Sequence, residues 1–205
     1  MRADMNLTAH TLKQQNIDDR HRYQDLCLLF DQTFAQNENT RLIKGNDEPV
    51  YLPAGNKHDH HQIVFAHGYF ASALHEVSHW CIAGKQRRLL EDYGYWYCPD
   101  GRNNQQQEEF EQVEIKPQAI EWAFSVAVQK PFRVSSDNLH GAQADTLAFH
   151  AKVQQQALNY LQQGFPLRAQ QFIRVLQDFY LSPPLCPKDF SSPELTPSRE
   201  SNGTI

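Results

Sequence analysis

The segment YFASALHEVSHWCIA, residues 69–83, is the most informative part of this sequence. Apolar residues occupy nearly every position apart from those of His75, Glu76 and His79, as expected for a helix buried on most sides. Gly84 follows directly, and glycine commonly ends a helix. Two histidines four residues apart lie one turn apart on the same helix face, so both imidazoles can reach one metal ion. We therefore predict a buried helix that carries a metal site.

The remaining ligands are less well defined by the sequence. Glu76 lies beside the histidines and could act as a base, as a partner of the ligands or as a further ligand. Two imidazoles need at least one more protein ligand, for which Glu114, Glu121 and His67 are candidates. We favour Glu114, because it is polar among apolar neighbours near the expected start of a helix that would pack on residues 69–83. The alternative is that Glu114 is an ordinary charge at a helix N-terminus.

Periodicity outside this segment predicts an α+β fold. Spacings of three and four between apolar residues are typical of helices, and short β-branched or aromatic runs between turn residues are typical of strands. Pro117 lacks an amide donor, so we expect it to bend or start a helix. The predicted helices cover residues 19–36, 69–83, 119–127, 143–163 and 167–181, and the strand-like runs cover 41–44, 50–52, 62–66 and 93–97. The result is a helix-dominated single domain with a small sheet in its first half and a zincin-like site helix.

Length and composition fit one compact domain. The 205 residues suit a single core, with a polar, flexible leader over residues 1–18, a metal-binding domain over 19–181 and a disordered tail over 182–205 that is rich in proline and serine. The leader lacks the apolar run of a signal peptide, and no stretch approaches the roughly 20 apolar residues that cross a bilayer. We therefore expect no membrane association.

Charge and cysteine content narrow the class of protein further. The net charge of −5 argues against a nucleic-acid binder, which usually has a basic balance or stripe. Four cysteines without a CxxC pair favour a reduced setting over a disulfide framework or a thiolate zinc site. We expect a cytoplasmic protein that is a monomer.

Two histidines and a carboxylate with open coordination positions are compatible with two kinds of enzyme. With zinc, Glu76 could deprotonate a bound water and the site would hydrolyse peptides. With iron(II), the open positions would serve an oxygenase. A third possibility is a binding module whose metal is purely structural. The bare His-Glu motif favours the peptidase, and spacing alone does not separate the metals.

The wider sequence resembles the elongation factor P hydroxylase family. The resemblance runs from about residue 23 to residue 180, and the string YGYWYCPDGR over residues 93–102 is much more specific than the His-Glu motif. The four segments that carry it are residues 41–53, 63–84, 93–102 and 113–119.

The resemblance implies an iron-dependent protein hydroxylase, an oxidoreductase of the monooxygenase kind. Its substrate would be the lysine of bacterial elongation factor P that already carries a β-lysyl group, and it would use molecular oxygen and one or two iron ions. Carried over to this chain, His75, His79 and Glu114 would hold iron, and Glu76 would be the catalytic or supporting carboxylate.

A substrate side chain with two amino groups is long and cationic, which suits a slot with carboxylates at its mouth and aromatic walls. Asp100 could supply such a charge, and Tyr69 and Tyr95 could form the walls. The alternative is that Asp100 is an ordinary turn residue and that the tyrosines belong to the core.

Overall fold

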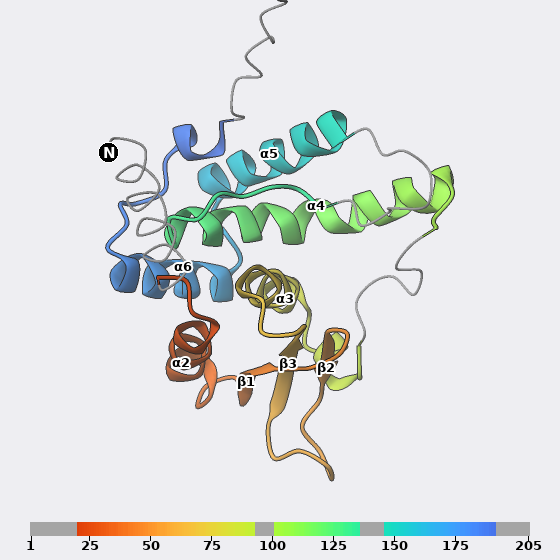
Figure 1. Ribbon diagram of the computed structural model, residues 1–205, viewed down its shortest axis with the longest axis vertical. Coiled ribbons are helices and arrows are strands. Elements are labelled where there is room, and N and C mark those ends of the chain that lie inside the picture. The colour runs from red at the N-terminus through yellow and green to blue at the C-terminus, as the bar shows by residue number, and fades with distance from the viewer. Residues whose placement is uncertain (1–19, 93–100, 136–145, 192–205) are drawn as a thin grey trace, which may run out of the picture.

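The computed structural model describes residues 20–92, 101–135 and 146–191 (Figure 1). Their helices are α2 (Tyr23–Phe34), α3 (Phe70–Ile82), α4 (Asn104–Ala127), α5 (Thr146–Gln163) and α6 (Leu167–Tyr180), with two short 3-10 helices, η1 (Arg87–Leu89) and η2 (Pro187–Phe190). The strands are β1 (Thr40–Lys44), β2 (Val50–Leu52) and β3 (His61–Phe65). The predicted α+β class, dominated by helices and with a small sheet in the first half, is confirmed.

The sheet has β3 at its centre. β1 pairs with β3 in parallel, with Leu42 opposite Ile63, and β2 pairs with it antiparallel on the other side. Leu42, Ile63 and Phe65 are buried, because α2 packs on β1 and α3 packs on β3. Figure 1 shows α3 lying between the sheet and the long helix α4. The helix that carries the His-Glu motif, α3, therefore packs directly on the sheet.

A tight turn leads from β3 directly into α3. Both His67 and Gly68 have positive φ angles, 51° and 79°. A Cβ atom on Gly68 would lie 3.1 Å from the side chain of Lys44 and 3.2 Å from that of Tyr23, so glycine fits both the conformation and the space. The start of α3 is therefore fixed against the sheet.

An aromatic cluster packs α3 against α2 and α6. The Trp80 ring of α3 lies 5.1 Å from that of Phe30 and 4.9 Å from that of Phe34, both from α2. The Phe30 ring lies 5.7 Å from that of Phe172 in α6. All four side chains are buried, and such edge-on aromatic contacts add to the free energy of burial.

The helix α4 corrects one prediction from the sequence. Pro117 does not start a helix but lies inside one that runs from Asn104 to Ala127 and includes the glutamine-rich segment. Asn103 and Gln106 form a capping box at its N-terminus. A proline inside a helix costs about 3 kcal/mol. Packing of α4 against α3, α5 and α6 offsets that cost. Such tertiary contacts cannot be predicted from local sequence patterns.

The packed region extends past the predicted boundary at residue 181 and includes η2. Phe190 is fully buried, its ring lies 5.6 Å from that of Trp122, and its carbonyl accepts a hydrogen bond from Gln154. The leader over residues 1–18, the strand-like run 93–97 and residues 192–205 of the tail lie outside the described residues. Among the described helices, none is both long and apolar enough to span a bilayer.

Arg168 of α6 caps the C-terminal end of α3. One terminal nitrogen of its guanidinium donates to the carbonyls of Trp80, Cys81 and Ala83 at 2.7, 3.2 and 2.6 Å. The guanidinium carbon lies 4.4 Å from the centroid of the Trp80 ring. The last carbonyls of a helix otherwise lack hydrogen-bond partners. Arg168 supplies these partners and so stabilises the end of the helix that carries the histidines.

Replacing Arg168 with methionine should lower the free energy of unfolding by about 2–3 kcal/mol, because three partly buried carbonyls lose a charged donor. Urea denaturation measures the change. The matched control is Arg174→Met on the exposed side of the same helix, which should change the stability by less than about 0.5 kcal/mol. Equal losses in the two variants would contradict the capping role.

Candidate metal centre

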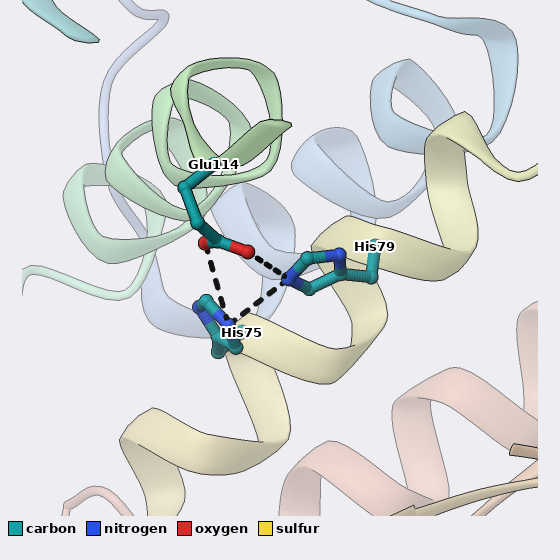
Figure 2. A group of neighbouring side chains, drawn as sticks. All are labelled: His75, His79 and Glu114. Carbon is teal, nitrogen blue, oxygen red and sulfur yellow. Dashed lines mark hydrogen bonds and ion pairs between the residues drawn. The ribbon is translucent and has the colours of Figure 1, made fainter. Parts of the chain in front are cut away.

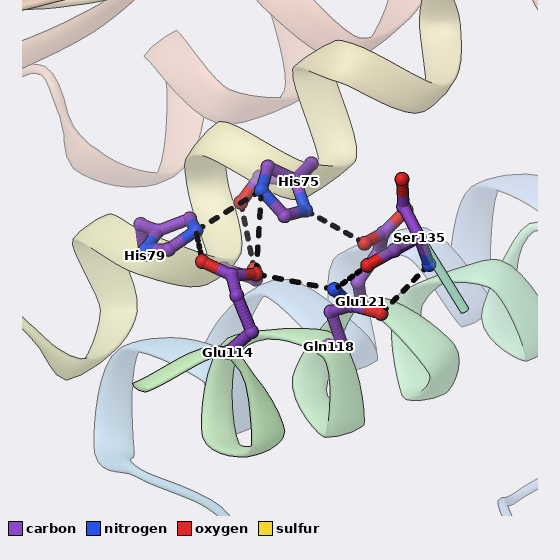
Figure 3. Close-up of polar contacts among 7 residues, drawn as sticks. His75, His79, Glu114, Gln118, Glu121 and Ser135 are labelled. Atoms are coloured by element: carbon purple, nitrogen blue, oxygen red, sulfur yellow. Dashed lines mark hydrogen bonds and ion pairs between the residues drawn. The ribbon is translucent and has the colours of Figure 1, made fainter. Parts of the chain in front are cut away.

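The site lies where α3 and α4 pack against each other in opposite directions. His75 contacts Glu121, whereas His79, one turn later on α3, contacts Glu114, which precedes Glu121 on α4. Glu114, Gln118 and Glu121 are spaced by four and three residues, so they share one face of α4. Two helical stripes thus bring together five polar side chains from distant parts of the chain (Figure 3).

The predicted ligands His75, His79 and Glu114 converge on one point (Figure 2). The Nε2 atoms of the two imidazoles are 3.0 Å apart, and Glu114 Oε1 is 3.2 Å from His79 Nε2. Glu114 Oε2 is 3.8 Å from His75 Nε2. Two ligand atoms bound about 2.1 Å from the same ion lie roughly 3.0–3.4 Å apart in octahedral or tetrahedral geometry. Two of the three distances fall within this range and the third exceeds it by about 0.4 Å, so the donor set is close to the geometry that a single divalent transition-metal ion requires.

The buried histidines and carboxylates of this centre strongly shift one another's pKa values. Burial disfavours the charged form of His75, but the hydrogen bond to Glu121 and the negative charges of Glu121, Glu114 and Glu76 outweigh it and raise its pKa to about 10. Burial likewise opposes ionisation of Glu114, but His79, His75 and Gln118 outweigh it and lower its pKa to about 2. Without a metal, the centre therefore holds a charged imidazolium next to a carboxylate.

Glu121 occupies a different position from the one considered in the sequence. Its Oε2 lies 2.9 Å from Nδ1 of His75, the ring nitrogen opposite the one that faces Glu114. A carboxylate on this nitrogen holds its proton there, so Nε2 is left with a lone pair for a metal. Glu121 is therefore placed to orient a ligand.

The sequence also predicts roles for Glu76, Tyr69, His67, Tyr95 and Asp100. Glu76 lies on α3 close enough for the charges of His75 and His79 to act on it, and burial raises its pKa. Tyr69 is 64% exposed at the N-terminus of α3, so it does not belong to the core, and its ring lies 5.7 Å from that of the exposed His67. His67 is outside the ligand cluster. The remaining two, Tyr95 and Asp100, lie outside the described residues.

Sequence reasoning missed Gln118, which lies one turn after Glu114 on α4. Its Nε2 donates to Glu114 Oε2 at 3.2 Å and to the carbonyl of Ser135 at 2.7 Å. The signals in the sequence were its place in the resembling segment 113–119 and the four-residue spacing from Glu114, which is common between polar residues on a helix. The contact with Ser135 depends on the tertiary fold.

Fold and donors together define a helical α+β protein with a candidate site of two histidines and one carboxylate. Residues 29–190 match the model of a family described as elongation factor P hydroxylase. The chain belongs to this family. It is also 47% identical over 160 residues to the elongation factor P lysine hydroxylase of Haemophilus influenzae, an alignment that covers 78% of this chain and 90% of the relative. The resemblance found in four segments of the sequence is confirmed, and neither match names a peptidase or a structural metal module.

The raised pKa of His75 predicts how the metal-free protein responds to alkali. A histidine whose pKa is raised by folding stabilises the protein below its unfolded value of 6.5, and this stabilisation is lost as the pH rises towards about 10. The Tm of chelator-treated protein should therefore fall between about pH 7 and pH 10. The fall should be smaller for Glu121→Gln, which removes the charge that acts most strongly on His75.

Thermal denaturation followed by circular dichroism at several pH values measures this difference. The matched control is Glu108→Gln, an exposed position on the same helix, which should follow the wild type. Parallel curves for all three proteins would show that Glu121 does not stabilise the charged form of His75.

Proposed function

We propose that this protein is an iron-dependent hydroxylase that acts on the lysylated lysine of elongation factor P. The observation that carries the proposal is that the matched region, residues 29–190, contains the whole candidate metal centre. The relative from Haemophilus influenzae is named as a hydroxylase of a lysine of elongation factor P, which supports the same substrate here.

In this proposal His75, His79 and Glu114 hold iron(II) through one oxygen and two nitrogen atoms. Such a set is typical of iron enzymes that keep coordination positions open. One or two bound iron ions would supply the activation of molecular oxygen that hydroxylation requires. The two Nε2 atoms lie 3.0 Å apart, so a single cation could bind both of them in place of the proton that they share without metal.

The chain's own residues have distinct tasks around the ion. Glu121 keeps a proton on Nδ1 of His75 and so directs Nε2 towards the ion. Glu76 is the candidate catalytic carboxylate, because burial raises its pKa and favours its protonated form, so it can hold or move a proton beside the ligands. The exposed ring of Tyr69 could contact a cationic substrate group.

The first experiment combines metal analysis with mass spectrometry. Protein purified without added metal should contain iron, and incubation with lysylated elongation factor P and a reductant should increase the substrate mass by roughly 16 Da, one oxygen atom. His75→Ala and His79→Ala should remain folded and lose both the iron and the mass increase. Glu76→Gln should keep the iron and lose most of the mass increase.

Two outcomes would contradict the proposal. Unchanged iron content in both histidine variants would exclude the candidate centre as the iron site. Zinc in the purified protein, with no mass increase after reconstitution with iron(II), would instead support the peptidase or the structural site.

Metal binding near neutral pH should release about one proton for each ion bound. The reason is that His75 has its pKa raised to about 10 without metal, whereas a metal ligand must be the neutral imidazole. Calorimetric titration with Co²⁺ in two buffers of different ionisation enthalpy measures the number released. An identical observed enthalpy in both buffers would contradict this protonation state.

A further inference from the structure

Gln118 is the most deeply buried amide in contact with the candidate centre, with 1% of its surface exposed. Figure 3 shows it between Glu114 and the backbone of Ser135. Its Oε1 accepts a hydrogen bond from the amide of Ser135 at 3.0 Å, and its Nε2 donates to the carbonyl of the same residue at 2.7 Å. The side chain therefore satisfies both backbone groups of one residue that follows α4.

This double contact fixes the direction in which the amide points. Turning the amide over would place its NH₂ group against the N–H of Ser135 and its oxygen against the carbonyl, so neither bond could form. The second N–H of Gln118 is thereby directed at Oε2 of Glu114, 3.2 Å away. Oε1 of the same carboxylate lies 3.2 Å from His79 Nε2, whereas Oε2 lies farther from its nearest histidine nitrogen, at 3.8 Å from His75 Nε2.

We propose that Gln118 is a positioning residue that fixes the orientation of the Glu114 carboxylate, so that Oε1 is presented as the ligating oxygen while Oε2 accepts the hydrogen bond of Gln118. The inference rests on the proposed role of Glu114 as a metal ligand. A carboxylate that binds through one oxygen uses one coordination position, whereas binding through both oxygens would use two. Gln118 thus keeps a position available for the chemistry of the site.

Gln118 could in principle do no more than tie the segment ending at Ser135 to α4, and a control can separate these roles. Gln154 makes a comparable contact away from the metal centre, where its Nε2 donates to the carbonyl of Phe190 at 2.6 Å. Loss of that contact should affect stability alone. A positioning role predicts in addition that the metal itself reports the loss of Gln118.

The experiment uses the full chain, stripped with a chelator and titrated with Co²⁺. Gln118→Met keeps the length of the side chain and removes all of its hydrogen bonds. We expect the affinity for Co²⁺ to fall about 10- to 100-fold, the range typical of lost contacts to metal ligands. We also expect the visible absorption spectrum of the Co²⁺ protein to change, because Oε2 becomes free to bind. Gln154→Met should keep the affinity and the spectrum of the wild type.

A second variant covers the case in which Gln118→Met does not fold. Gln118→Asn keeps the amide but is one methylene shorter, so it cannot reach Glu114 and Ser135 together, and it should change affinity and spectrum in the same direction. Wild-type affinity and an unchanged spectrum in the folded variants would overturn the positioning role and leave the proposed function standing. A wild-type protein that binds no Co²⁺ would overturn both proposals.

Discussion

The helices α3 and α4 contact each other through polar side chains within an otherwise apolar interior. The candidate site depends on this contact. Two imidazoles and the carboxylates of Glu114 and Glu121 lie between the helices, with Glu114 only 4% exposed. Unpaired charges at such depth would cost several kcal/mol each. Mutual pairing offsets this cost without metal, and a bound cation would offset more of it. The fold can therefore accommodate these buried charges only while the four side chains stay paired with one another.

The rest of the structure keeps α3 and α4 in the positions that allow this pairing. The turn at His67 and Gly68 fixes the start of α3 against the sheet, and Arg168 of α6 completes its end. On the other side, α4 continues through Pro117, so Glu114 and Glu121 remain on one unbroken helix two turns apart. Both helices are thus held from several directions, which is the rigidity that a metal site needs from its scaffold.

The sequence allowed the site helix to be predicted closely, because its signals are local. Apolar periodicity, Gly84 and the four-residue spacing of His75 and His79 all act within one element. Glu114 was favoured from its neighbours, and the structure brings it to the histidines. The roles of Glu121 and Gln118 could not be predicted, because they depend on the antiparallel docking of two helices and on the position of Ser135. The continuity of α4 through Pro117 was missed for the same reason, since tertiary packing overrides a local preference.

The balance of charge at the centre connects the site to the proposed substrate. With neutral imidazoles and one divalent ion, the carboxylates of Glu76, Glu114 and Glu121 would leave one negative charge in excess. Burial already raises the pKa of Glu76 in the metal-free protein, although the charges of His75 and His79 act against it. A cationic substrate group close to Glu76 would remove the excess and favour its ionised form. A substrate rich in amino groups therefore complements the centre electrostatically, and its arrival would change the protonation of the same carboxylate that we propose to handle the proton.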